Sequence, residues 1–399
     1  MKRFKMTIFF CVLVTILVTL LIRIGWAEAA PASAAGCGSW SIVSSPSPGA
    51  GNDNLMSVAS ISVNDVWDVG SDLTGTGTNI VYQTLAEHWD GSHWRIVSSP
   101  DPGSGDNQLN GVAAVSTSDV WAVGADTNSS LIDQTLVEHW DGSRWSVVPS
   151  PNAGQMGAGF DGIAIVSAND IWAVGTYLAN GSTNYTLTEH WNGTKWSIVS
   201  SPNPQPGGNY LNKVVAISSS NVWAVGGSFN STGAPTLVEH WNGSQWSVVS
   251  SPSPGLHYND LTGVTAISAN NIWAAGNYYS KGRASTRTLV EHWDGSSWNV
   301  VSSPNVASVK NYLWGITAAS ANNIWAVGYT SPPSSRFKAR TLIEHWDGMK
   351  WSIVPSPNPP GSSNNSLAAV GQVPRTQQFW AVGDNLQTGG GKTLTEFYC

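Results

Sequence analysis

Charged residues are scarce in this chain of 399 residues, where Asp, Glu, Lys and Arg together make up only 11%. About 25% is typical of soluble proteins. Surface helices need charged side chains on their solvent face, so coiled coils and helical solenoids are excluded. The net charge of −7 argues against nucleic-acid binding, which depends on a positive surface. Long disordered stretches are disfavoured, because 41% of the residues are hydrophobic and 10% are aromatic.

The beginning of the chain has the pattern of an export signal. Three basic residues within the first five precede an apolar run at residues 6–22, and an alanine-rich stretch follows at 27–35. We expect removal of residues 1–34, which leaves residues 35–399 as a secreted or cell-surface protein. An uncleaved membrane anchor through residues 6–22 is the alternative, since about 17–25 apolar residues span a bilayer. Without residues 1–34, 24 acidic and 14 basic residues remain, a net charge of −10.

Three short motifs, each built on an aromatic residue, recur seven times after this leader with a period of 50 to 55 residues. The tryptophans of V-W-A-V-G are Trp67, Trp121, Trp172, Trp223, Trp273, Trp325 and Trp380. E-H-W ends at Trp89, Trp140, Trp191, Trp241, Trp293 and Trp346, and its seventh copy reads Glu396-Phe397-Tyr398. W-S-V-V begins at Trp40, Trp94, Trp145, Trp196, Trp246, Trp298 and Trp351. A period of this length is typical of propeller blades.

Each repeat divides into four strands and shows no helical period. In the second repeat the expected strands cover 109–115, 119–123 and 135–140, with a fourth starting at Trp145. Asp-Gly or Asn-Gly precedes the fourth strand in six repeats, and such pairs favour tight hairpins because they tolerate positive φ. The pattern predicts an all-β, seven-bladed β-propeller of four-stranded antiparallel blades over residues 35–399. A linear β-solenoid, the alternative, has rungs much shorter than this repeat.

The two ends of the chain are predicted to share one blade. The chain starts with a fourth strand at Trp40 and ends with a third strand at Tyr398, so the N-terminal strand completes the C-terminal blade. Cys37 and Cys399 align with the two turn residues, Asp-Gly or Asn-Gly, of the other six hairpins. Cysteine pairs in exported proteins form disulfides. We therefore predict a Cys37–Cys399 disulfide at the seam.

The Glu-His pair of the E-H-W motif invites a metal-binding interpretation, which strand geometry opposes. Adjacent strand residues point to opposite faces of a sheet, so one pair cannot ligate one ion. We expect a packing role instead, with the Glu of one blade meeting the His of the next. The repeated tryptophans are expected to fill the spaces between blades. No metal or cofactor is expected.

Differences in length between the repeats concentrate in the loops that follow the second strand, on the same rim as the loops between blades. Loops on a rigid scaffold often carry binding residues. Half of the basic residues after the leader, among them Lys310, fall in blades 5 and 6, near a tryptophan outside the three series. The candidate ligand-binding residues are Tyr278, Tyr279, Lys281, Arg283, Arg287, Trp314, Arg336, Lys338 and Arg340. A solvated rim without a binding role is the alternative.

The mature chain resembles exported bacterial propeller proteins and is distantly similar to kelch, galactose-oxidase-like and Asp-box repeats. The turn W-D-G-S-x-W, from Trp89 to Trp94, occupies the place of the Asp-box. Its Asp-to-Trp spacing of four departs from the Asp-box, and V-W-A-V is followed by one glycine where kelch has two. The resemblance therefore implies the fold and carries over no active site.

These observations lead us to expect a monomeric, non-enzymatic extracellular binding or scaffold protein. Its ligand would be a glycan or a protein, with an acidic ligand suited to the basic patch. Repetition favours this interpretation, because a catalytic set is needed once whereas the repeated polar residues have a packing explanation. The alternative is a glycan-active hydrolase or lyase with single-copy acids, for which Asp161 and Asp68 are candidates. Asp68 stands where the other repeats have alanine.

Overall fold

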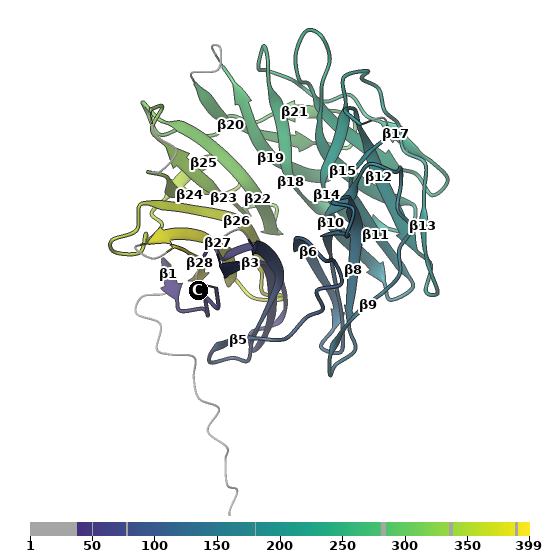
Figure 1. Ribbon diagram of the computed structural model, residues 1–399. Coiled ribbons are helices and arrows are strands. Elements are labelled where there is room, and N and C mark those ends of the chain that lie inside the picture. Colours follow the sequence, from purple (N-terminus) through teal and green to yellow (C-terminus); the bar gives the residue numbers. More distant parts are fainter. Residues whose placement is uncertain are drawn as a thin grey trace, which may run out of the picture.

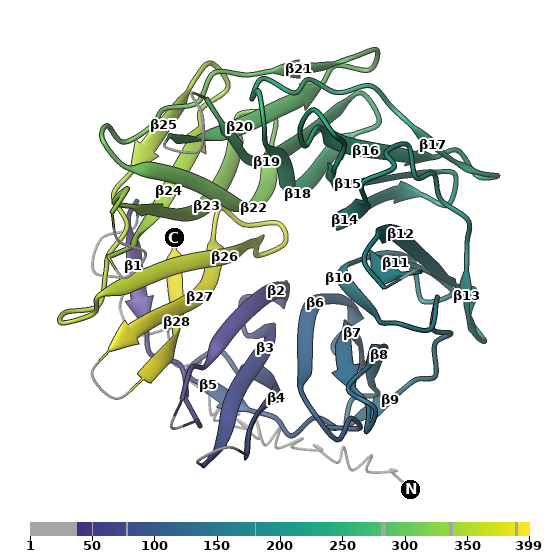
Figure 2. The same cartoon turned by 45° about the horizontal axis from the view of Figure 1, so that its top comes forward.

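The computed structural model describes residues 38–49, 51–76, 79–179, 181–280, 285–334, 338–387 and 390–399. Within these ranges the chain forms seven separate four-stranded antiparallel sheets. No helix in these described ranges is long and apolar enough to cross a membrane. The sheets stand in a ring with their first strands toward its centre (Figure 1, Figure 2). The seven-bladed propeller predicted from the repeats is confirmed.

Six blades are consecutive in the chain, and the seventh joins both ends. Blades 1 and 2 comprise β2 (Asn54–Ser62), β3 (Asp65–Thr76), β4 (Asn79–Trp89), β5 (Trp94–Ile96), and β6 (Asn107–Ser116), β7 (Asp119–Thr127), β8 (Asp133–Trp140), β9 (Trp145–Val147). Blades 3 and 4 comprise β10 (Ala158–Ser167), β11 (Asp170–Leu178), β12 (Asn184–Trp191), β13 (Trp196–Ile198), and β14 (Asn209–Ser218), β15 (Asn221–Ser228), β16 (Thr236–Trp241), β17 (Trp246–Val248). Blades 5 and 6 comprise β18 (Asn259–Ser268), β19 (Asn271–Tyr279), β20 (Thr286–Trp293), β21 (Trp298–Val300), and β22 (Lys310–Ser320), β23 (Asn323–Ser331), β24 (Arg340–Trp346), β25 (Trp351–Val354). Blade 7 comprises β26 (Asn364–Gln372), β27 (Phe379–Gln387), β28 (Gly390–Tyr398) and β1 (Trp40–Val43).

The seam of the ring lies in blade 7, where β1 pairs with β28. Trp40 is the cross-strand partner of Tyr398, the register that the sequence predicts. The N–H of Gly38 donates to the carbonyl oxygen of Cys399 at 2.9 Å. Cys37, like the predicted leader, lies outside the described residues. Closure by the N-terminal strand is thus observed, and the disulfide stays a prediction.

The core is divided into wedges between neighbouring blades. Leu109 of blade 2 lies in one hydrophobic cluster with Trp67 and Val69 of blade 1. Trp145, on the outer strand of blade 2, meets Trp67 edge-on with ring centroids 5.3 Å apart. The seven outer-strand tryptophans are only 4–5% exposed. The tryptophans therefore fill the spaces between blades, as predicted.

The Glu-His pairs behave differently from the prediction. His139 bonds through Nε2 to Oδ1 of Asp119 in its own blade at 2.8 Å and packs on Trp121. In blade 7, Glu396 instead accepts a hydrogen bond from Ser356 Oγ of blade 6 at 3.0 Å. The expected Glu–His contact across the blade interface is wrong. The His139 ring instead bonds to Asp119, the first residue of the second strand of its own blade.

The glycine that ends each V-W-A-V-G motif touches the innermost strand. An added methyl group at Gly124 would lie 1.9 Å from the carbonyl oxygen of Gln108. We expect Gly124→Ala to lower the free energy of unfolding by about 3 kcal/mol or more, since the backbone has to shift. Gly159→Ala is the control, because its methyl group would meet only the Ala125 side chain, at 3.1 Å. Equal urea midpoints for the two variants would contradict this expectation.

Candidate ligand-binding site

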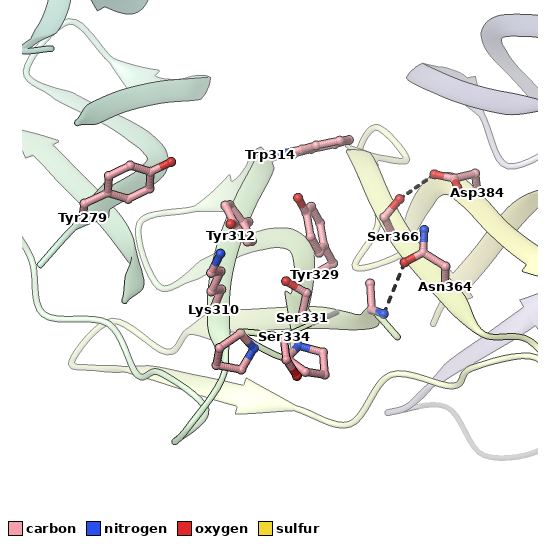
Figure 3. A pocket seen from close by; sticks show the side chains of 13 residues that line it. Tyr279, Lys310, Tyr312, Trp314, Tyr329, Ser331, Ser334, Asn364, Ser366 and Asp384 are labelled. Atoms are coloured by element: carbon pink, nitrogen blue, oxygen red, sulfur yellow. Dashed lines mark hydrogen bonds between the residues drawn. The ribbon is translucent and has the colours of Figure 1, made fainter. Parts of the chain in front are cut away.

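A cavity of about 750 Å³ opens between blades 6 and 7 on the rim that carries the long loops. One side of the cavity is formed by β22, β23 and residues 332–334 of blade 6. The other side is formed by the start of β26 and the second half of β27 in blade 7. Tyr279 reaches it from β19 of blade 5 (Figure 3). The ends of second strands and the starts of inner strands meet here, so this rim offers a site that is open to solvent.

Three aromatic rings of blade 6 build one wall of this rim cavity. Tyr312 and Trp314 both lie on β22, where the strand bulges at Trp314, and Tyr329 is the cross-strand partner of Tyr312. The two tyrosine rings stack with centroids 4.7 Å apart and planes 19° apart. Trp314 meets Tyr329 edge-on at 5.3 Å (Figure 3). Their mutual packing fixes these rings before any ligand arrives.

Polar side chains stand on the two sides of this wall. Lys310 lies beside Tyr312, whereas Ser366 and Asp384 lie on the blade 7 side (Figure 3). Ser366 Oγ donates a hydrogen bond to the Asp384 carboxylate. Burial raises the pKa of Asp384, and this hydrogen bond opposes the rise. The rim cavity thus presents a cation, a carboxyl group and hydroxyls around aromatic rings, a set that suits a polyhydroxylated ligand.

A smaller cavity of about 160 Å³ lies among the inner strands and also touches Trp314. One inner-strand position from each of the seven blades lines it: Met56, Asn110, Asp161, Asn212, Thr262, Trp314 and Ala368, together with Lys213. Lys213 Nζ donates to the carbonyl oxygens of Asp161 at 2.6 Å and Asn110 at 3.1 Å. Burial raises the pKa of Asp161 to about 6, while nearby Lys213 opposes the rise. Trp314 therefore borders both the central cavity and the rim cavity.

The structure brings only part of the predicted patch together. Two predicted residues line the rim cavity with Lys310: Tyr279 and Trp314. Three are exposed and do not line it: Arg287, Lys338 and Arg340. Tyr278 packs against the core between blades 4 and 5. The remaining three lie outside the described residues: Lys281, Arg283 and Arg336.

Asp68 has no exposed surface through which it could contact a substrate. It is fully buried opposite Glu87 of the neighbouring strand. Burial and the adjacent Glu87 carboxyl raise the pKa of Asp68 well above its usual range.

Among the residues that the structure describes, no group of three or more His, Cys, Asp or Glu side chains is placed to hold a metal ion.

Several cavity residues were missed at the sequence level. Tyr312 could have been found, because it lies two residues before Trp314 and a regular strand would place both on one face. Asp384 could also have been found, since it occupies the position that Tyr329 has in blade 6. Ser366 and Asn364 carry no such signal, because serine and asparagine are common in every loop of this chain.

Comparison with known proteins gives the fold and no family. No family model matches the sequence. No curated protein matches it either. Among solved structures, YCF48 from Cyanidioschyzon merolae is 15% identical with a TM-score of 0.52, covering 90% of this chain and 99% of its own.

Two further solved structures are more distant. YCF48 bound to D1 peptide is 11% identical with a TM-score of 0.38, covering 76% of this chain and 94% of its own. An ulvan lyase of polysaccharide lyase family PL25, bound to a -[GlcA(1-4)Rha3S]- saccharide, is 10% identical with a TM-score of 0.45, covering 74% and 77%. Similarity at this level shows no function, and the resemblance to kelch and Asp-box repeats stays a prediction.

Proposed function

We propose that this protein is a non-enzymatic, extracytoplasmic glycan-binding protein whose rim cavity between blades 6 and 7 holds an acidic saccharide. The wall of Tyr312, Tyr329 and Trp314 beside Lys310 is the observation that carries this proposal. An aromatic ring packs on the C–H face of a pyranose, while neighbouring polar groups bond its hydroxyls. The Lys310 ammonium suits a carboxylate or sulfate on the sugar.

The cavity lining favours a sugar over a peptide. Besides the rings, two prolines and Ala339, its side chains are hydroxyl, amide or charged groups, including Asn364 and Asp384. Peptide grooves rely on pockets for alternate side chains or on aromatic-lined tracks for proline-rich segments. A protein ligand is therefore the less favoured partner at this site.

Binding to a glycan array, followed by titration of the positive sugars, tests the proposal. We expect Trp314→Ala to weaken binding about thirtyfold, since a buried aromatic anchor contributes about 2 kcal/mol or more. Lys310→Glu is expected to lower the affinity for acidic glycans about tenfold and the affinity for neutral glycans less. Lys195→Glu is the matched control, because Lys195 is an exposed lysine in a third-to-fourth-strand hairpin at the opposite rim.

Three outcomes would contradict the proposal. An array with no binding, or binding unchanged by both cavity variants, excludes a glycan site between blades 6 and 7. Release of shortened products from the same glycans, lost in Asp161→Asn, would instead identify an enzyme. That second function is favoured by one observation, the raised pKa of Asp161 beside Lys213 in the central cavity.

A further inference from the structure

A second rim cavity lies between blades 4 and 5, next to the one already described. Its volume is about 690 Å³, and its lining comes from residues 229–234 together with His257, Tyr258 and Tyr279. Tyr279 lines both cavities. The two cavities therefore adjoin at one aromatic side chain that projects from the end of β19 (Figure 3).

Four consecutive blades each carry a pair of packed aromatic rings near this rim. The pairs, one each in blades 3 to 6, are Tyr177–Tyr185, Tyr210–Phe229, Tyr258–Tyr279 and Tyr312–Tyr329, with centroids 4.7 to 5.6 Å apart. In blades 1 and 2, the position of Tyr177 is occupied by Asp72 and Asp126. Among the described residues, blades 3 to 6 thus carry aromatic pairs at this rim, whereas blades 1 and 2 carry an aspartate at the position of Tyr177.

Asp260 anchors the aromatic residues between the two cavities. Tyr258 donates its hydroxyl to Asp260 Oδ2 at 3.0 Å, and Asn212 Nδ2 donates to Oδ1 at 2.9 Å. Tyr258 in turn stacks on Tyr279 with ring centroids 4.8 Å apart. Asp260 itself is only 7% exposed. The shared wall is therefore held in place by buried hydrogen bonds, which is the support that a preformed binding site needs.

We propose that the two rim cavities are successive subsites of one groove, and that the ligand is a linear polysaccharide chain which crosses Tyr279. This inference rests on the proposed function and extends it, because a single sugar would need only one of the two cavities. A chain that occupies both subsites gains the contacts of the second at little additional entropic cost, since it is already tethered at the first. Affinity should therefore rise with chain length until both cavities are filled.

The test is a titration of the full mature chain with size-graded oligomers of galacturonic acid and of hyaluronan, from the dimer to the octamer. We expect the octamer to bind about tenfold or more tightly than the dimer. Phe229→Ala alters only the cavity between blades 4 and 5. This variant should bind the octamer about tenfold more weakly than the parent does and should bind the dimer with unchanged affinity. Tyr279→Ala should weaken the octamer further, because Tyr279 lines both subsites.

Tyr185→Ala is the matched control, since it disrupts the stacked pair of blade 3, which lines neither cavity. All variants are compared only if their thermal midpoints match that of the parent. Equal affinity for dimer and octamer, or an effect of Tyr185→Ala equal to that of Phe229→Ala, would overturn the groove while leaving the single site intact. No binding of any oligomer or array glycan would overturn the proposed function itself.

Discussion

Breaking the predicted Cys37–Cys399 disulfide is expected to lower the free energy of unfolding by about 5 kcal/mol. The bond would close a loop that contains the whole propeller, and the entropy removed from the unfolded chain grows with loop length. The local geometry supports the pairing, because the N–H of Gly38 already donates to the carbonyl oxygen of Cys399 at 2.9 Å. Other contacts at the seam include the four residue pairs between β1 and β28 and the hydrogen bonds that Thr393 donates to Ser47 and Pro46.

Mass spectrometry of the unreduced protein should find a peptide pair joined at these cysteines. Denaturant titrations with and without reductant then give the free-energy difference, and the double variant Cys37→Ser, Cys399→Ser should behave like the reduced parent. Cys11→Ser should change nothing, because residue 11 belongs to the predicted leader. Complete alkylation of both thiols in the native protein, before reduction, would show that the bond does not form.

Stability is also expected to fall by roughly 3 kcal/mol or more as the pH rises from about 5 to about 9. Each blade buries the glutamate of its E-H-W motif or of the seventh copy completely. Burial raises the pKa to about 9 for Glu138 and to about 8 for Glu189, Glu239, Glu291, Glu344 and Glu396. Between the unfolded value of 4.5 and these values, the folded state holds protons that the unfolded chain has released. Raising the pH through this window therefore favours unfolding, and below it the effect is flat.

Thermal midpoints measured across this range in buffers of constant ionic strength test the expectation. Glu189→Gln should flatten the decline, because burial is the one cause that raises the pKa of Glu189 and the amide cannot ionise. Asp133→Asn is the control, since Asp133 is exposed and should leave the slope unchanged. A midpoint that stays constant or increases toward pH 9 would mean that the folded state solvates these carboxylates.

Most of the fold follows from the sequence because the repeat is strong and local. The tryptophan series and the Asp-Gly turns fix four strands per repeat, and counting residues from Trp40 and Tyr398 gives the register of the seam. The Glu-His contact was mispredicted for a physical reason. Strand alternation gives the face on which His139 lies, but it does not reveal that Asp119 is nearer than the next blade.

The candidate site was predictable only in part, and most clearly where a residue departs from the repeat. Trp314 does so, and it lies at the junction of two cavities. Charge alone was a poor guide, because Arg287, Lys338 and Arg340 belong to the same blades yet do not line the rim cavity. Which loop residues turn inward depends on packing between neighbouring blades, and periodicity within one repeat contains no information about that packing.

Blades 1 to 6 each consist of four strands that follow one another in the chain, so each can form without a distant segment. Blade 7 cannot, because β1 is among the first segments synthesised and its partner β28 is the last. A product that stops short of Gly390 would leave β1 unpaired and the circle open, with the core beside Trp40 uncovered. The position of the seam thus couples closure of the ring to the presence of the last strand of the chain.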